Sequence, residues 1–327
     1  MAEKLRWGIL ATGGIAALFV KDLQMHGHAV SAVGSRSEVS ARAFADRFGI
    51  ARVHGSYEAL CADPEVDAIY VATPHPMHHA NARLALEHGK HVLIEKAFTV
   101  NAAEAQDLVD LAADKGLVVL EAMWTRFLPH MVRIREIVRS GLLGEIRSVV
   151  ADHTQDLPDD PRHRLNALDL GGGALLDLGI YPISFTFDVL GRPESIVARA
   201  RMKDTGADGT VATIFTYASG AIATTLSASD TAGRNIATIH GTDGRIEIDK
   251  VWYAPTSFRR YDATNTVVED YRSNVEGRGM QYQAAELERL VAGGRIAGEI
   301  LSPAESVAIM AAMDEVRRQI GLRYPTE

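Results

Sequence analysis

Gly8-Ile-Leu-Ala-Thr-Gly-Gly-Ile-Ala16 is the stretch of this 327-residue chain that decides the fold of its first part. It ends a strand expected at residues 5–10 and opens a helix expected to run to about residue 26. A dinucleotide-binding turn requires glycine at its first two marked positions and a small residue at the third. Here these positions are Ala11, Gly13 and Ala16, so the first departs from the pattern. Bare N–H groups at a helix N-terminus suit a pyrophosphate, although a purely structural turn can have the same sequence. We predict a dinucleotide contact by Ala11, Thr12, Gly13, Gly14 and Ile15.

The first part of the chain alternates apolar strand patterns with helical patterns. Strands separated by helices of roughly ten residues or more indicate parallel βαβ units. Near-continuous apolar strands indicate a sheet that is buried on both faces. We expect strands at 28–33, 68–72, 91–95 and 117–120, and helices at 37–48, 76–88 and 102–115. The pattern predicts an α/β Rossmann domain, a doubly wound parallel sheet, over residues 1–122.

The second part, residues 123–327, changes to alternating strands joined by short turns. After a helix at 131–140 we expect strands at 146–153, 195–202, 210–227 (interrupted by a hairpin turn at Ser219-Gly220), 236–240, 245–248, 257–261 and 267–271. Such strands with few helices predict an α+β domain on one large, mainly antiparallel open-faced sheet. A terminal helix at 303–320, with Ser302 as N-cap and Pro303 in its first turn, fits against either domain.

Composition limits the function classes. The formal net charge of −8 disfavours sequence-independent binding of nucleic acid, which requires a basic face. No apolar run approaches the roughly 20 residues that span a bilayer, so we expect no membrane contact. The single cysteine, Cys61, cannot form an internal disulfide, and we expect it to pack as a small apolar residue in a helix. The expected location of the protein is the cytoplasm. His75 and His79 have no third ligand at zinc-like spacing, so we expect no metal.

The end of the second expected strand indicates which cofactor is bound. NAD enzymes place an acidic residue there for the ribose 2′-hydroxyl. This chain has Ser35-Arg36-Ser37 instead, a cation between two hydroxyls that suits a 2′-phosphate. The pattern favours NADP over NAD, although a plain surface arginine has the same appearance.

Two further motifs carry candidate chemistry. Lys96 follows the expected strand 91–95, and active sites in open α/β sheets lie at the carboxyl ends of strands. A glycine run at 171–173 opens a helix on which Asp177 and Tyr181, four residues apart, share one face. Each residue also has a structural alternative to catalysis. Lys96 is then a partner in a structural ion pair, and Tyr181 is a buried residue that is hydrogen-bonded to a carboxylate.

The order of these motifs resembles the Gfo/Idh/MocA oxidoreductases. The resemblance rests on the glycine turn, Thr73-Pro-His-Pro-Met-His78, Glu95-Lys96 and the segment 171–181. Glu121-Ala-Met-Trp-Thr-Arg-Phe127 and the tyrosine at 181 resemble the branch of dimeric dihydrodiol dehydrogenases and NADP-dependent D-xylose 1-dehydrogenases. One departure is Ala97, where the family usually has proline.

The resemblance implies NADP as cofactor and a homo-oligomer, usually a dimer, assembled through the second-domain sheet. It implies that Lys96 is catalytic, that Tyr181 stands where many relatives have histidine, and that Asp177 holds the family's acidic position. It further implies cofactor contacts by Thr73, Pro74, His75, His78, Glu95 and Lys96.

The substrate wall is expected to include Trp124, Arg126, Phe127, His153 and Trp252. His153 makes this wall more polar than that of the animal dihydrodiol enzymes, which favours a sugar or polyol over an aromatic diol. The expected reaction is hydride transfer between nicotinamide and a hydroxyl-bearing carbon, with Tyr181 first and Lys96 second as proton acceptor. The alternatives are a dihydrodiol or inositol dehydrogenase, a catalytically silent regulator that senses NADP and sugar, and a Rossmann-type methyltransferase.

Overall fold

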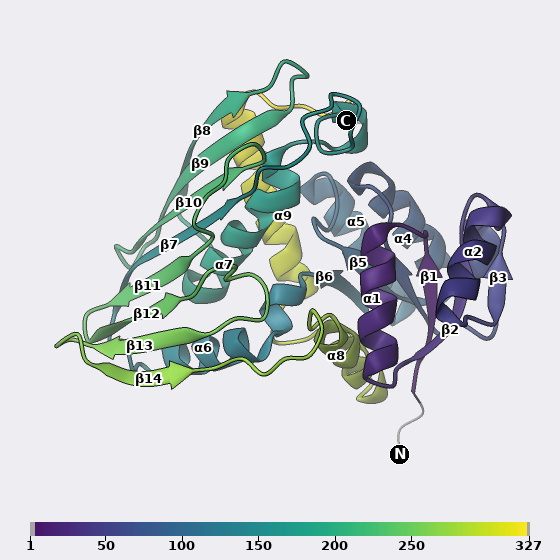
Figure 1. Cartoon of the computed structure of the whole chain (residues 1–327), viewed down its shortest axis with the longest axis horizontal. Coiled ribbons are helices and arrows are strands. Elements are labelled where there is room, and N and C mark those ends of the chain that lie inside the picture. The colour runs from purple at the N-terminus through teal and green to yellow at the C-terminus, as the bar shows by residue number, and fades with distance from the viewer. Residues whose placement is uncertain (1–3, 326–327) are drawn as a thin grey trace. The chain divides into compact units, whose positions relative to one another are not determined.

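The computed structural model describes residues 4–325, and the chain groups into two compact units. The first comprises the chain up to Trp124 together with Gly277–Val307. The second comprises Thr125–Glu276 together with the chain from Ala308 onward. Both predicted architectures are confirmed, a parallel Rossmann sheet and a larger, mainly antiparallel sheet (Figure 1).

The first unit is built on six parallel strands in the order β3-β2-β1-β4-β5-β6. This is the order of doubly wound dinucleotide-binding folds, whose strands end at one common edge. The strands are β1 (Arg6–Leu10), β2 (Ala29–Gly34), β3 (Arg52–His54), β4 (Ala68–Val71), β5 (His91–Glu95) and β6 (Val119–Ala122). The main helices are α1 (Gly14–Met25), α2 (Glu38–Phe48), α3 (Tyr57–Cys61), α4 (His78–Glu87) and α5 (Ala102–Lys115).

Local chemistry explains where several of these elements begin. Ser37 caps α2 by accepting the N–H of Ser40, and Asn101 caps α5 by accepting that of Glu104. Cys61 is fully buried in α3, as predicted, and burial raises the pKa of its thiol to about 12. Such a thiol stays protonated and acts as packing.

The segment Gly277–Val307, predicted to belong to the second domain, groups with the first unit. Its helix α8 (Gln281–Ala292) is tied to β1, because Glu288 accepts the indole N–H of Trp7 at 2.9 Å. The carboxylate of Asp22, buried in α1, accepts the backbone N–H groups of Arg278 and Met280. The chain thus returns to the first unit before α9 (Pro303–Ile320), whose first turn is capped by Ser302.

Ala11 occupies the tight turn after β1 with a φ of +91°, in the region that normally favours glycine. A side chain in left-handed backbone costs about 1–2 kcal/mol. We therefore expect Ala11→Gly to stabilise the protein by about 1 kcal/mol, measured by urea unfolding followed by circular dichroism. Ala17→Gly, inside α1, is the control and should destabilise by a similar amount. A destabilised Ala11→Gly variant would contradict the assigned strain.

The second unit is built on eight strands in the order β14-β13-β12-β11-β7-β10-β9-β8. All neighbours pair antiparallel except β7 and β10, which run parallel. The strands are β7 (Ile146–Thr154), β8 (Ser195–Met202), β9 (Asp208–Thr216), β10 (Ile222–Ala228), β11 (Ala237–Gly241), β12 (Gly244–Ile248), β13 (Phe258–Asp262) and β14 (Val267–Tyr271).

Helices cover one face of this sheet. They include α6 (Pro129–Arg139) and the segment formed by a π-helical turn (Leu175–Gly179) and α7 (Ile180–Leu190) (Figure 1). Val149, Ala151 and His153 of β7 point toward the helices and are buried, whereas Val150 points away and is exposed. The stretch Leu168–Leu190 is long and apolar enough to cross a membrane, but it is mostly buried, as expected of a core helix.

Candidate active site

A cavity of about 560 Å³ lies at the carboxyl edge of the Rossmann sheet, where β1, β2 and β4 end. Eight of its lining residues are predicted cofactor contacts: Ala11, Thr12, Gly13, Ser35, Arg36, Ser37, Thr73 and Pro74. Four more were not predicted: Ser40, Tyr57, Ala72 and Met77. The cavity therefore unites three loops that are far apart in the sequence.

The start of α1 suits a pyrophosphate. A Cβ built on Gly13 or Gly14 meets no atom within 4 Å, so open space rather than protein packing lies beside these glycines. The first turn of α1 contains no acidic residue, and the helix dipole there favours an anion. These features fit the phosphates of a dinucleotide.

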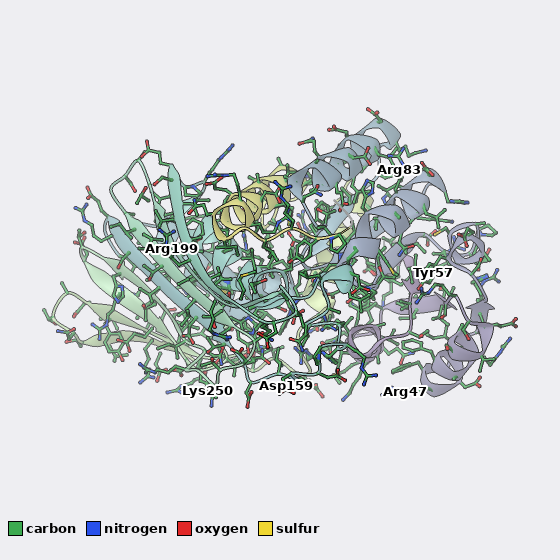
Figure 2. The ribbon with its side chains drawn as sticks, turned by 90° about the horizontal axis from the view of Figure 1, so that it is seen from above. Arg47, Tyr57, Arg83, Asp159, Arg199 and Lys250 are labelled. Atoms are coloured by element: carbon green, nitrogen blue, oxygen red, sulfur yellow. The ribbon has the colours of Figure 1, made fainter. Side chains whose placement is uncertain are left out.

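Arg36 provides the cation at the end of β2. Its side chain is exposed at the cavity, between Ser35 and Ser37, and these three residues include no acidic group for a ribose 2′-hydroxyl. Burial raises the pKa of Tyr57, which is labelled in Figure 2, while the neighbouring Arg36 charge opposes the rise. The phenol and guanidinium thus lie together on this wall of the cavity.

Tyr57 was missed because its place depends on β3, a three-residue strand too short to produce a sequence pattern. Ser56, which caps α3 by accepting the N–H of Ala59, was the available signal that a helix starts beside β3. Ser40 is the third residue of α2, three residues after the predicted Ser37, and helical spacing alone would have suggested it.

Lys96 lies half-buried at the end of β5, on the edge of the sheet that also bears the cavity. The ring of His75 contacts its carbonyl oxygen at 3.2 Å, and its peptide bond to Ala97 is cis. Glu95, the preceding residue, is 5% exposed and accepts the hydroxyl hydrogen of Tyr70. The backbone that carries Lys96 is therefore held from two sides.

His78 has a different place from the one expected. Its ring is fully buried and lies between the carbonyl oxygens of Thr73 and Ala97, at 2.8 and 2.9 Å. Burial lowers its pKa, which favours the neutral ring. His78 therefore joins the loops after β4 and β5 instead of lining the cofactor cavity. The buried Glu95 likewise faces Tyr70 in the core.

In the second unit, Tyr181 belongs to an aromatic cluster at the end of β7. The His153 ring stacks on Tyr253 at 3.7 Å and meets Tyr181 edge-on at 4.9 Å. Gln155 donates a hydrogen bond to the Tyr253 hydroxyl at 3.1 Å, and its amide nitrogen lies 2.8 Å from Nε2 of His153. A neutral His153 that accepts this bond carries its proton on Nδ1. The cluster gives Tyr181 a fixed, polar-lined setting.

Tyr253 and Gln155 were missed, because they lie in loops with no motif of their own. Asp177, on the turn before Tyr181, is largely buried. The guanidinium of Arg164 lies 3.4 Å from its carboxylate. Arg164 belongs to the loop that precedes the glycine run, so this loop is fastened to the helix that carries Asp177 and Tyr181.

Four predicted substrate-wall residues are packed inside the protein. Arg126 is 3% exposed, donates to Ser184 and lies 3.2 Å from Asp188. Trp252 is fully buried, with its indole N–H donated to the carbonyl of Asp152. Trp124 and Phe127 are 2% and 4% exposed. Their positions near strand ends suggested an open wall, but their side chains are part of the packing. His153 is equally buried, at 2% exposed, and its ring lies against Tyr181.

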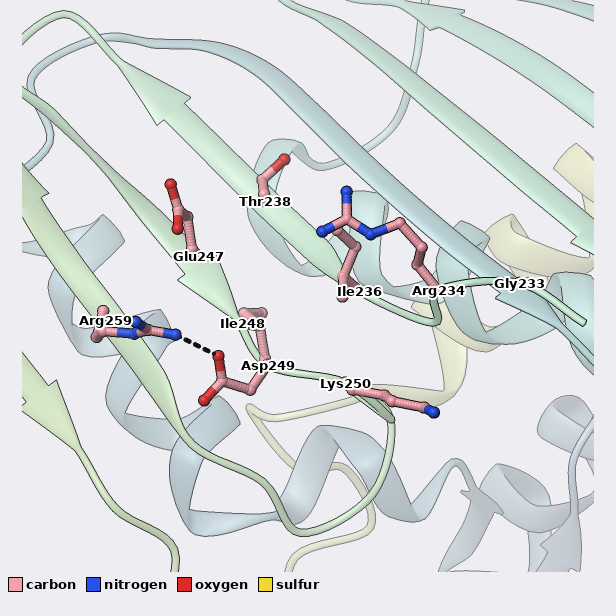
Figure 3. Close-up of a pocket in the computed structure, with 9 residues that line it drawn as sticks. All are labelled: Gly233, Arg234, Ile236, Thr238, Glu247, Ile248, Asp249, Lys250 and Arg259. Atoms are coloured by element: carbon pink, nitrogen blue, oxygen red, sulfur yellow. Dashed lines mark hydrogen bonds and ion pairs between the residues drawn. The ribbon is translucent and has the colours of Figure 1, made fainter.

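A groove of about 710 Å³ occurs on the sheet face opposite α7 (Figure 3). Its lining includes Thr238, Glu247 and Arg259 on three adjacent strands, and Arg259 pairs with Asp249 at 2.8 Å. The groove therefore lies on the other face of the sheet from Tyr181. Within residues 4–325, no group of three or more His, Cys, Asp or Glu side chains is arranged to hold a metal ion.

The fold and the cavity define a protein with a dinucleotide-binding Rossmann unit. Residues 5–123 match the family described as "Oxidoreductase family, NAD-binding Rossmann fold", and residues 131–247 match the "GFO/IDH/MocA C-terminal domain". The chain belongs to the Gfo/Idh/MocA oxidoreductase family, as the resemblance had indicated.

Relatives of known activity match along nearly the whole chain. The D-xylose 1-dehydrogenase (NADP(+)) of Hypocrea jecorina is 36% identical, over 98% of this chain and 93% of that protein. The trans-1,2-dihydrobenzene-1,2-diol dehydrogenase of Mus musculus is 35% identical, over 99% of both chains. Among solved structures, the 3-ketoreductase KijD10 of Actinomadura kijaniata, in complex with NADP and TDP-benzene, is 28% identical with a TM-score of 0.85 and covers 97% of this chain and 98% of its own.

Proposed function

We propose that this protein is an NADP-dependent dehydrogenase that transfers a hydride between the nicotinamide and a hydroxyl-bearing carbon of a sugar or polyol. The observation that carries the cofactor assignment is Arg36, exposed at the cavity between two serines. The relatives that use or contain NADP support the same assignment. When bound, NADP supplies the hydride acceptor.

Residues of this chain accept the proton that leaves the substrate hydroxyl. We assign Tyr181 as the first acceptor of the substrate hydroxyl proton and Lys96 as the second. Asp177 orients the substrate hydroxyl or the phenol. The reverse assignment, with Lys96 as the direct acceptor, makes a different prediction for Tyr181→Phe and is tested by it.

The substrate class follows from the groups around Tyr181. His153, Gln155 and Tyr253 are hydrogen-bonded to or stacked on one another beside Tyr181, so its surroundings are both polar and aromatic. Hydrogen-bonding side chains with one aromatic platform suit a sugar or polyol better than an unsubstituted aromatic ring. The D-xylose enzyme among the relatives supports this choice, and the dihydrodiol enzyme defines the alternative.

The experiment for the reaction is a panel of aldoses, inositols and trans-dihydrodiols, each with NADP and with NAD. We expect the absorbance band of reduced nicotinamide to grow with NADP and an aldose, and more slowly with a dihydrodiol. Reduction only with a dihydrodiol would select the alternative substrate class. Tight NADP binding without turnover on any compound would indicate a sensing protein.

We further propose a homodimer formed through the sheet of the second unit. On the face opposite α7, Val197, Ile214, Thr224 and Val150 lie side by side on four adjacent strands. The four apolar side chains Val150, Val197, Ile214 and Ile222 are 45–49% exposed. No helix among the described residues covers this apolar row. Such a face marks an interface, and a two-fold dimer is the simplest closed assembly that buries it.

Ile214→Lys tests the dimer. A charge in the centre of this face should convert a particle of twice the 35.4 kDa chain mass into a monomer, as measured by light scattering at micromolar concentration. Val39→Lys is the matched control, because Val39 is 80% exposed on α2 of the other unit. A parent protein that is monomeric, or an Ile214→Lys variant that stays dimeric, would contradict the interface.

A further inference from the structure

Asp208, at the start of β9, is a buried acid with no part in the proton transfer described above. Its side chain is fully buried, and one carboxylate oxygen accepts the backbone N–H of Leu175 at 2.6 Å. The N–H of Ala174 also faces this carboxylate. Leu175 is the first residue of the π-helical turn that continues into α7. Asp208 is therefore an N-terminal cap supplied from a distant strand.

The local sequence is built around this cap. Ala174, at the helix N-cap position, offers no side-chain acceptor of its own. Gly173 has a φ of +135°, and a Cβ on it would lie 2.0 Å from Oδ1 of Asp208. Only a glycine allows the carboxylate to approach so closely, which gives a physical reason for a glycine at this place.

The helix that Asp208 caps carries two of the proposed reacting groups. Asp177 lies in the π-helical turn, and Tyr181 is the second residue of α7. Backbone hydrogen bonds at the first turn fix where the helix starts and how it is rotated about its axis. A change in this turn therefore displaces the Asp177 carboxylate and the Tyr181 phenol, although neither touches Asp208.

We propose that Asp208 is a positioning residue of the reaction, which holds the Asp177 and Tyr181 side chains in place by capping their helix. This inference rests on the proposed function, since it assigns Asp208 a role through those two groups.

The strength of this cap depends on whether Asp208 is ionised. Burial raises the pKa of Asp208 to about 7, against the opposing backbone hydrogen bonds and the Lys203 charge. Lys203 itself donates to Asn166, and near Gly209 the Arg201–Asp230 ion pair lies in the same region. The ionised carboxylate is the stronger acceptor and the better partner for a helix N-terminus. The start of the helix should therefore tighten as the pH rises through about 7.

The free energy of unfolding changes with pH in the opposite direction to the strength of the cap. A raised pKa in the folded protein means that folding favours the neutral acid, so the stabilisation is complete below the ordinary pKa of 3.8. It is lost as the pH rises through about 7. This contribution to global stability therefore declines between pH 3.8 and about 7 and is constant above that, whereas the helix start becomes more ordered around pH 7.

The test uses the full chain with Asp208→Asn, and Asp204→Asn as the matched control on the exposed turn before β9. Asp208→Asn should accelerate amide hydrogen exchange at residues 175–178 by roughly 10-fold and lower kcat by a similar factor. Its Kd for NADP, set in the other unit, should stay within about twofold, and the inflection of kcat near pH 7 should disappear. Asp204→Asn should change none of these.

Unchanged exchange at 175–178, or an unchanged kcat together with an unchanged pH profile, would overturn the proposal. If Asp208→Asn fails to fold, the parent alone decides. Its exchange protection at 175–178, corrected for intrinsic rates, should rise between about pH 6 and 8, and a flat dependence would also overturn the proposal. Amide exchange requires no turnover, so accelerated exchange in a protein inactive on every substrate would refute the proposed function and leave the capping role of Asp208 supported.

Discussion

Lys96→Met and Tyr181→Phe should each lower kcat by roughly 10²- to 10⁴-fold, the usual contribution of a positioned acid–base group. The first change removes the charge at the end of β5 and roughly keeps the length of the side chain. The second removes only the phenolic hydroxyl and leaves the ring against His153 and Tyr253. Steady-state kinetics with an aldose and NADP measure both variants.

The controls for this pair are Lys115→Met, on the exposed last turn of α5, and Tyr282→Phe, on α8. Both should retain parental kcat. The double variant Lys96→Met/Tyr181→Phe should be little worse than the poorer single variant, because groups that act as one unit are not additive. A fully inactive Lys96→Met beside a near-parental Tyr181→Phe would assign the proton to Lys96 itself, and two active single variants would mean that the site is misplaced.

Arg36→Ala should remove most of the preference for NADP over NAD. A charge-assisted hydrogen bond is worth about 1.5–3 kcal/mol, so the Kd for NADP should rise roughly 10- to 100-fold while the Kd for NAD barely changes. Fluorescence titration of both cofactors gives the ratio. Arg47→Ala is the control on α2, the helix that follows Arg36, because the guanidinium of Arg47 lies over the Phe48 ring. Equal affinities for NADP and NAD in the parent would contradict the role of Arg36.

The regular elements were predictable because their signals are local. The alternation of apolar strands with helices gave the Rossmann sheet, and the period-two strands gave the second sheet. The three-residue strand β3 was not predicted, since it is too short to show a periodicity of its own. The grouping of Gly277–Val307 with the first unit was not predicted either, because it depends on long-range contacts such as that of Trp7 with Glu288.

The candidate site was predictable where a motif marks it and unpredictable where packing decides. The glycine turn and Ser35-Arg36-Ser37 were found from the sequence and line one cavity. Burial cannot be read from one sequence, so Arg126 and Trp252 were expected on an open wall although both are packed inside. Tyr253 and Asp208 come from strand ends and loops that reach the reacting helix only in the folded chain.

Transfer of a labelled hydride from substrate to cofactor would establish the proposed reaction. The protein is incubated with NADP and D-xylose that carries deuterium at C1, and the reduced cofactor is analysed by mass spectrometry. We expect one deuterium in the reduced cofactor that the parent forms, and much less of this product with Lys96→Met. Reduced cofactor without deuterium, or no reduced cofactor with any aldose or polyol tested, would contradict the proposed reaction.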